Sequence, residues 1–215
     1  MLRFDSTPDQ PMTILCLGAH SDDIEIGCGG TLLRLLRDND EVTVVWVVFG
    51  SVQQRTAEAH RSAELFLARA RAKTIIVKEF RDGFFPYIGA EIKDYFEQLK
   101  RDFSPDVIFT HYRDDLHQDH RLISDLTWNT FRRHLILEYE IPKYDGDLGS
   151  PNFFVRLDEA TCQTKIEHLL TCFATQANKH WFTADTFWSL LRLRGIEANL
   201  PTTYAEAFYC RKLTM

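Results

Sequence analysis

The sequence predicts an α/β fold in which a mainly parallel β-sheet is covered by helices on both faces. Nearly continuous apolar runs alternate along the chain with segments whose apolar residues recur at helical spacing. Continuous apolar runs are typical of strands that are buried on both faces. Strands that alternate with helices in this way favour a parallel sheet between two helical layers.

The first half of the chain alternates regularly between the two kinds of element. A short apolar strand is predicted at residues 13–17, after a leader at 1–12 that contains two prolines. A helix is predicted at 31–37 from its apolar spacing, and a β-branched strand at 42–49. Residues 56–72 are rich in Ala, Glu, Arg and Leu, which predicts a long helix, and the next strand follows at 74–77.

The second half continues this pattern. The helices of this half are predicted at 89–101, 120–135, 159–172 and 186–193. Strands are predicted at 107–110, 153–155 and 204–210, the last from strand-like alternation. Residues 138–149 are polar and contain proline and glycine, which predicts a long loop.

Length and composition narrow the class of protein. A chain of 215 residues supports one sizeable core, so we expect a single domain over residues 1–215. The net charge of −6 disfavours a nucleic-acid partner, which needs a basic surface. No apolar run is long enough to span a membrane, and no signal peptide is visible. The five cysteines lack C-x-x-C spacing, so we expect reduced thiols and a cytoplasmic location.

Two clusters of histidine and aspartate follow two of the predicted strands. His20, Asp22 and Asp23 come directly after the strand at 13–17, and a second cluster spans residues 111–120 after the strand at 107–110. In open α/β sheets, functional sites form beyond the carboxyl ends of the strands. We therefore expect the two clusters to meet and to hold one metal ion.

The types of side chain indicate a catalytic zinc site. Such a site has three protein ligands and one position for water. His20 and Asp23 supply two ligands from one loop, and His120 supplies the third. Asp22 is then free to act as general base toward the metal-bound water, whose pKa the metal lowers. We expect one zinc per chain, with another divalent ion as the alternative.

Three further residues of the second cluster are predicted to stabilise the intermediate or to orient the histidines. His117, if protonated, can stabilise the oxyanion of a tetrahedral intermediate and help to protonate the leaving amine. Asp119 and Asp115 are placed to orient the imidazoles and to keep His117 cationic.

Each of these residues also has a structural interpretation. An Asp-Asp pair often caps a helix N-terminus, which is the strongest competitor for Asp22 and Asp23. His117 and His120 could simply open a helix. A dinucleotide fingerprint starting at Gly27 fails because position 32 is leucine, so we interpret Gly27, Gly29 and Gly30 as packing residues.

The two clusters together resemble the signatures of a known family. The run from His20 to Thr31 resembles the A-H-P-D-D-x-E-x-G-x-G-G-T motif of the LmbE-like, or PIG-L, deacetylases. The run from Asp115 to His120 is similar to their D-x-H-P-D-H motif. The resemblance implies a Rossmann-like three-layer sandwich without a dinucleotide. It also implies zinc ligands His20, Asp23 and His120, base Asp22 and oxyanion partner His117.

The resemblance further implies what the substrate looks like. Family members are zinc-dependent hydrolases that remove an acetyl group from N-acetylglucosamine-type sugars, and related proteins are often homo-oligomers. We expect Arg55 to bind sugar hydroxyls or a phosphate, and Tyr144 to stack on a pyranose ring. Ser21 and Gln118 replace prolines of the family motifs, which puts specificity in doubt more than activity.

The sequence therefore predicts an N-deacetylase, an amidohydrolase acting on linear amides. Its small-molecule substrate is an N-acetylated amino sugar or a conjugate such as a sugar nucleotide, glycolipid or polysaccharide precursor. The first alternative is a metal-dependent phosphoesterase, which would usually need ligands for two metals. The second is a non-catalytic sugar-binding module, against which Asp22 argues because a binding module needs no base beside the metal.

Overall fold

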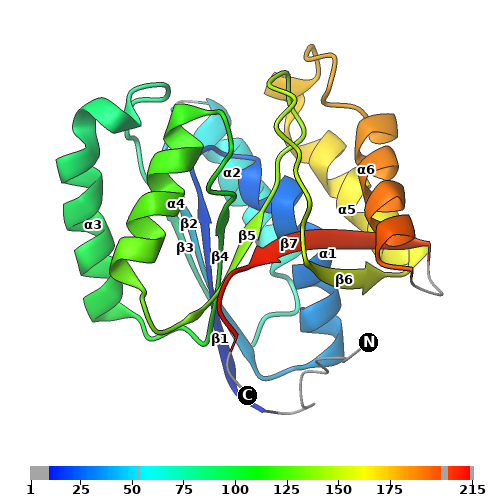
Figure 1. The fold of residues 1–215 in the computed structure, drawn as a ribbon, viewed down its shortest axis with the longest axis horizontal. Helices are drawn as coiled ribbons and strands as arrows, with labels where there is room; N and C mark the ends of the chain where they lie inside the picture. The colour runs from blue at the N-terminus through cyan, green and yellow to red at the C-terminus, as the bar shows by residue number, and fades with distance from the viewer. Residues whose placement is uncertain (1–9, 53, 200–202, 214–215) are drawn as a thin grey trace.

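A computed structural model describes residues 10–52, 54–199 and 203–213. They form a seven-stranded sheet in the order β3-β2-β1-β4-β5-β7-β6 (Figure 1). The strands are β1 Met12–Gly18, β2 Val42–Val48, β3 Ala72–Val77, β4 Val107–His111, β5 Leu135–Tyr139, β6 Phe153–Leu157 and β7 Tyr204–Cys210. The first five are parallel, whereas β7 runs antiparallel to both β5 and β6.

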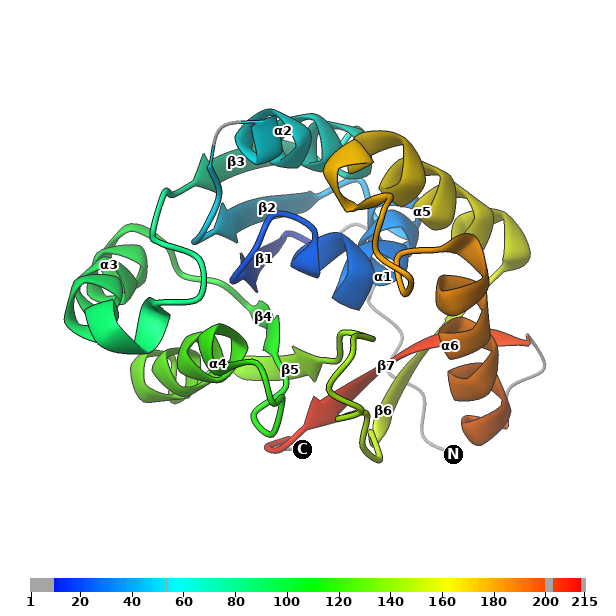
Figure 2. The ribbon, with the colours of Figure 1, turned by 90° about the horizontal axis from the view of Figure 1, so that it is seen from above.

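Helices cover both faces of the sheet, which confirms the predicted α/β sandwich. The helices are α1 Asp23–Asp38, α2 Gln54–Phe66, α3 Gly89–Asp102, α4 Gln118–Thr130, α5 Glu159–Cys172 and α6 Ala184–Glu197. Figure 2 shows α3 and α4 on one side and α1, α2, α5 and α6 on the other. Each side has its own buried apolar cluster, with Trp46 in one and Phe49 in the other. This division explains why the central strands are apolar on both faces.

Three element boundaries differ from the sequence predictions by five residues or more. Helix α1 begins at Asp23, well before residue 31, and so contains most of the first motif. Helix α2 ends at Phe66 instead of residue 72, and the chain turns so that the Arg71 N–H bonds to Val42. Helix α4 ends at Thr130, and the next five-residue strand, β5, was not predicted.

Strand β5 was not predicted because a charged residue interrupts its apolar run. Its fourth residue, Glu138, is fully buried in the sheet. The Trp128 indole N–H and the Arg211 guanidinium each donate to this carboxylate, at 2.6 Å. A buried carboxylate is tolerated when it is paired in this way, but its partners lie far away in the sequence.

The glycines of α1 are packing residues, as the sequence predicted. A Cβ on Gly27 would lie 2.2 Å from the ring of Tyr139, whose hydroxyl donates to the carbonyl of Leu17 at 2.7 Å. A Cβ on Gly29 would lie 2.6 Å from Phe66. Glycine therefore lets α1 approach β5 and α2 more closely than any side chain would allow.

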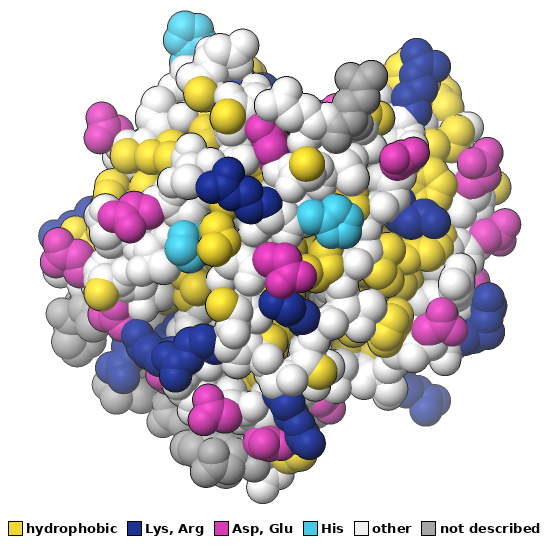
Figure 3. All heavy atoms as spheres, turned by 180° about the vertical axis from the view of Figure 1, so that it is seen from behind, with side chains coloured by type: hydrophobic (Ala, Val, Ile, Leu, Met, Phe, Trp, Pro, Cys, Tyr) yellow, Lys and Arg dark blue, Asp and Glu magenta, His cyan; other side chains and the backbone are white. Residues whose placement is uncertain are grey.

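Two further features are the distribution of charge on the surface and the length and polarity of the helices. On the face shown in Figure 3, acidic and basic side chains are interspersed, so neither sign dominates there. Within the described part of the chain, every helix is too short or too polar to cross a bilayer.

Candidate metal centre and active site

The two histidine–aspartate clusters meet at the centre of the sheet's carboxyl edge. Strand β1 leads into His20 and Asp22, and the adjacent strand β4 ends at His111. From β1 the chain builds the sheet outward to β2 and β3, and later returns to add β4 on the other side. The clusters therefore lie at the point where the strand order reverses, where open α/β sheets form their binding crevices.

The predicted ligand atoms lie at distances that suit one metal ion. His20 Nδ1 is 3.1 Å from His120 Nε2 and 3.4 Å from Asp23 Oδ2, and His120 Nε2 is 3.5 Å from Asp23 Oδ1. Two ligands of one tetrahedral zinc, each about 2.0–2.1 Å from it, lie roughly 3.3 Å apart. All three side chains are buried. The two imidazole nitrogens therefore have the spacing of two ligands of one ion, and Asp23 places one carboxylate oxygen beside each of them, so the chemistry of these residues fits a divalent ion.

Hydrogen bonds orient His120 for this role. Its Nδ1 lies 2.9 Å from Asp115 Oδ2, which leaves Nε2 facing His20 and Asp23. Lys143 Nζ is 3.0 Å from the same Asp115 oxygen. Burial raises the pKa of Asp115, but the hydrogen bond with His120 and the nearby cations outweigh it and lower that pKa. Asp115 is thus an ionised carboxylate beside Nδ1 of a candidate ligand, and its role in orienting that ligand stays a prediction.

Charge in the cluster is divided unequally between the histidines. Burial lowers the pKa of His20, but Asp23, Asp119 and Asp82 outweigh it and raise that pKa well above its usual value. Burial and the neighbouring His111 lower the pKa of His120 to about 3. Without a metal, the raised pKa therefore favours a proton on His20, beside the carboxylates of Asp23, Asp119 and Asp82.

His111 is a buried member of the cluster to which the sequence analysis gave no role. Its Nε2 is 3.2 Å from Asp23 Oδ2, and the ring stacks on His120 with the centroids 3.9 Å apart. The Ala19 N–H donates to the same Nε2 at 2.9 Å, which occupies its lone pair. We therefore place His111 behind the ligands. The feature of the sequence that could have identified His111 is its position at the end of β4.

Asp22 occupies the N-cap position of α1 without capping it. Its side chain accepts no backbone N–H of the helix, although Asp at this position usually does. Instead Oδ1 lies 3.6 Å from the guanidinium of Arg55. Burial and the charge of Asp23 raise the pKa of Asp22, while Arg55 lowers it. A buried carboxylate with a raised pKa is better suited to accept a proton.

His117 differs from the expected cation. Burial and the neighbouring His20 lower its pKa, and they outweigh Asp23, Asp119 and Asp115, which raise it. Its Nδ1 accepts the backbone N–H of Asp119 at 3.3 Å as the cap of α4. The proton of the neutral ring is therefore on Nε2, where it can be donated to an oxyanion without a net charge.

Two carboxylates contact the other nitrogen of His20. Asp119, which is fully buried, lies 3.4 Å from His20 Nε2 and accepts the N–H groups of Gly83 and Phe85. Asp82, which the sequence analysis missed, lies 3.0 Å from the same nitrogen and 3.3 Å from Arg55. Asp82 follows β3 at the same edge of the sheet. Its side chain is half-exposed, and that of Arg55 is partly exposed, whereas His20 is buried.

The two departures from the family motifs both form hydrogen bonds. The Ser21 hydroxyl bonds to Ser51 at 3.0 Å, and the Gln118 amide donates to the carbonyl of Gly83. These residues therefore connect the loops of the two clusters to neighbouring loops. Tyr144 is 70 % exposed, and its role in stacking on a sugar ring stays a prediction.

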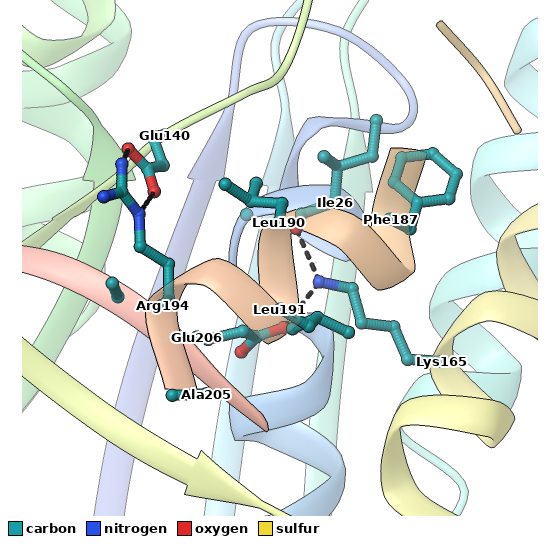
Figure 4. A pocket seen from close by; sticks show the side chains of 11 residues that line it. Ile26, Glu140, Lys165, Phe187, Leu190, Leu191, Arg194, Ala205 and Glu206 are labelled. Atoms are coloured by element: carbon teal, nitrogen blue, oxygen red, sulfur yellow. Dashed lines mark hydrogen bonds and ion pairs between the residues drawn. The ribbon is translucent and has the colours of Figure 1, made fainter. Parts of the chain in front are cut away.

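A buried ion pair supports α1 behind the cluster (Figure 4). Lys165 Nζ donates to Glu206 and to the carbonyl of Ile26, both at 2.6 Å. Glu206 also accepts the N–H groups of Gly30 and Thr31. The pair therefore bonds to the backbone in the middle of the helix whose first residue is Asp23, and links it to α5 and β7.

Comparisons with known proteins identify the family and the fold. A family model described as PIG-L, GlcNAc-PI de-N-acetylase, matches residues 15–131, more than half of the chain. The fold is similar to that of N,N'-diacetylchitobiose deacetylase from Pyrococcus horikoshii, with 20 % identity, a TM-score of 0.69 and coverage of 92 % of this chain and 82 % of that one.

Two other solved structures share the fold at lower identity. The zinc-inhibited form of teicoplanin deacetylase Orf2 is 14 % identical, with a TM-score of 0.69 and coverage of 92 % and 97 %. The 4-carboxy-2-hydroxymuconate hydratase GalB from Pseudomonas putida KT2440 is 15 % identical, with a TM-score of 0.70 and coverage of 95 % and 98 %. At these identities the likeness shows the fold alone, and the hydratase shows that the fold serves more than one reaction.

Proposed function

Because the chain belongs to the PIG-L family, we propose that it hydrolyses the acetamide of an N-acetylated amino sugar, releasing acetate and a free amine. The observation that carries the proposal is that His20 Nδ1 and His120 Nε2 lie 3.1 Å apart, as two ligands of one tetrahedral ion do, and that each lies within 3.5 Å of an oxygen of Asp23. The similarity to N,N'-diacetylchitobiose deacetylase supports a sugar substrate.

We assign the metal to His20, Asp23 and His120, and we infer that it is zinc because two imidazoles and one carboxylate are a common catalytic donor set for zinc. Zinc bound there supplies a Lewis acid that acidifies water and polarises the amide carbonyl. Asp115 holds His120 in the tautomer whose Nε2 can bind the metal.

Asp22 and His117 move and stabilise the remaining charges. Asp22 takes a proton from the attacking water as oxygen bonds to the carbonyl carbon, and returns it to the nitrogen as the C–N bond breaks. His117 donates its Nε2 proton in a hydrogen bond to the oxyanion of the tetrahedral intermediate. Arg55 and Asp82, which pair with each other and are both partly exposed, offer a donor and an acceptor to sugar hydroxyls.

The test is an acetate-release assay on the purified protein with one equivalent of zinc. The substrates are N-acetylglucosamine, an N-acetylated disaccharide, a sugar nucleotide and an N-acetylglucosaminyl lipid, each with and without a chelator. We expect chelator-sensitive acetate release from at least one of them. No release from any of the four would contradict the proposal. About two tightly bound ions per chain would instead favour the phosphoesterase alternative.

The Asp22→Ala variant tests the role of the base. It should retain one zinc and lose acetate release by at least about a hundredfold, the scale of a general base. The exposed His60→Ala on α2 is the control and should keep full activity. Near-normal turnover in Asp22→Ala would show that another group accepts the proton.

A further inference from the structure

A basic groove lies away from the candidate active site, between the C-terminal half of α4 and the segment after β7. Its volume is about 510 Å³. Four cationic side chains and one acidic side chain line it together with an indole: Arg113, Asp125, Trp128, Arg132, Arg211 and Lys212. His117 and Trp128 are at opposite ends of α4, roughly 16 Å apart at a rise of about 1.5 Å per residue.

The buried Glu138 holds three of the residues that line the groove in place. Its carboxylate accepts the Trp128 indole N–H and the Arg211 Nε–H, each at 2.6 Å, and the Arg113 backbone N–H at 3.0 Å. These contacts connect three lining residues to the same buried carboxylate. The negative charge of Glu138 also balances the positive charge of Arg211.

The other cations of the groove lack such a partner. Arg113 and Lys212 lie over the Trp128 ring, each 5.4 Å from its centroid. Among the described residues, no carboxylate lies within 4.0 Å of the charged nitrogens of Arg113, Arg132 or Lys212. The Nε of Arg113 is buried without a hydrogen-bond partner. A desolvated, unpaired guanidinium nitrogen costs free energy that an anion would offset.

We propose that this groove binds the phosphate group of a small phosphorylated molecule. Arginine forks and a lysine ammonium supply several charge-assisted donors, which a phosphate with its several acceptor oxygens can use together. The volume is that of a small-molecule site. Because Arg113 and Lys212 occupy positions over the indole, the recognition rests on the phosphate and not on stacking of a ring against Trp128.

The test is calorimetric titration of the zinc-loaded protein with glucose 6-phosphate, inorganic phosphate and glucose. Glucose 6-phosphate has no acetamide, so it is not a substrate of the proposed hydrolase. We expect saturable binding of glucose 6-phosphate, and no binding of glucose. Equal affinity for inorganic phosphate would identify free phosphate as the ligand, and the groove would remain the proposed binding site. The failure of both phosphates to bind would overturn the inference and leave the proposed function untouched.

Two double variants with equal changes of charge locate the binding. The groove variant is Arg132→Gln with Lys212→Gln, and the control is Arg133→Gln with Lys100→Gln, both exposed and outside the groove. We expect the groove variant to weaken binding by at least about tenfold, the scale of lost charge-assisted hydrogen bonds, and the control to keep it within about twofold.

Equal weakening in both variants would reduce the effect to net charge and overturn the inference. Unchanged binding in the groove variant, with loss in His120→Ala, would place the phosphate in the candidate metal centre and would also overturn it. Thermal unfolding midpoints of both variants check that they are folded, because all four substituted side chains are exposed.

Discussion

At the scale of single residues, Asp115 determines which nitrogen of His120 is available to a metal. It binds His120 Nδ1 at 2.9 Å and the His117 backbone N–H at 2.7 Å, so it holds both ends of the segment between them. Asp115→Asn can no longer offer a charged acceptor to the imidazole. We expect zinc affinity to fall about 10–100-fold, the usual effect of removing such a partner.

Competition with a chromophoric chelator measures this change. The neighbouring Asp114→Asn removes an equal charge from an exposed position and should leave the affinity unchanged. If Asp115→Asn bound zinc as tightly as the unmodified protein, the orientation of His120 would have to come from its packing against His111.

The charge on His20 makes metal binding depend on pH. Despite its burial, the surrounding carboxylates raise the pKa of His20, so the metal-free site holds a proton that zinc must displace. As pH falls below that raised pKa, the apparent affinity should fall by about tenfold per unit for one released proton. Above that pKa it should level off. Affinity measured across the range in which histidines titrate tests this, and a flat profile would contradict the protonated His20.

Packing of a single glycine sets the distance between α1 and the sheet. A methyl group at Gly27 would meet the Tyr139 ring at 2.2 Å, and this ring is held by its bond to Leu17. We expect Gly27→Ala to lower the free energy of unfolding by about 1–3 kcal/mol, as overpacking does. Chemical denaturation measures it. Gly89→Ala, whose new Cβ would have no neighbour closer than 3.8 Å, should cost little or nothing.

At the scale of elements, the Lys165–Glu206 pair joins α1, α5 and β7. Both side chains are buried, and both bond to the backbone of α1 as well as to each other. Removing one partner leaves an uncompensated charge in the interior. We therefore expect Lys165→Met to destabilise the protein by about 3–5 kcal/mol.

The double variant Lys165→Met/Glu206→Gln completes the test. It removes both charges and should recover part of the loss, because an unpaired buried charge is more costly than a neutral pair. Equal stability of the single and double variants, measured by denaturant unfolding, would show that the cost comes from lost packing alone.

At the scale of the whole molecule, the layers of the fold and the meeting of the two histidine–aspartate clusters could be predicted from the sequence for one physical reason. Apolar runs buried on both faces mark the central strands, and reactive side chains directly after β1 and β4 must share one edge of a parallel sheet. His20, Asp22, Asp23, Asp115 and His120 all follow from that rule. His111, at the end of β4, lies at the same edge for the same reason.

What the sequence did not predict depends on contacts between distant residues. Strand β5 contains Glu138, whose partners Trp128 and Arg211 come from α4 and the segment after β7. Helix α1 begins eight residues early because its glycines pack against Tyr139 and Phe66, despite their poor helix propensity. The neutral state of His117 and the approach of Asp82 to His20 likewise need the assembled site.

The bond between Glu206 and α1 also constrains the order of events during synthesis. The loop with His20, Asp22 and Asp23 is synthesised before the strand that supplies Glu206 to the same helix, which is the last of the seven described strands. Until β7 is inserted, Gly30 and Thr31 lack their carboxylate acceptor and Lys165 lacks its counterion. A nascent chain stalled before β7 should therefore remain open to proteases at α1, and should become resistant only when that strand is released.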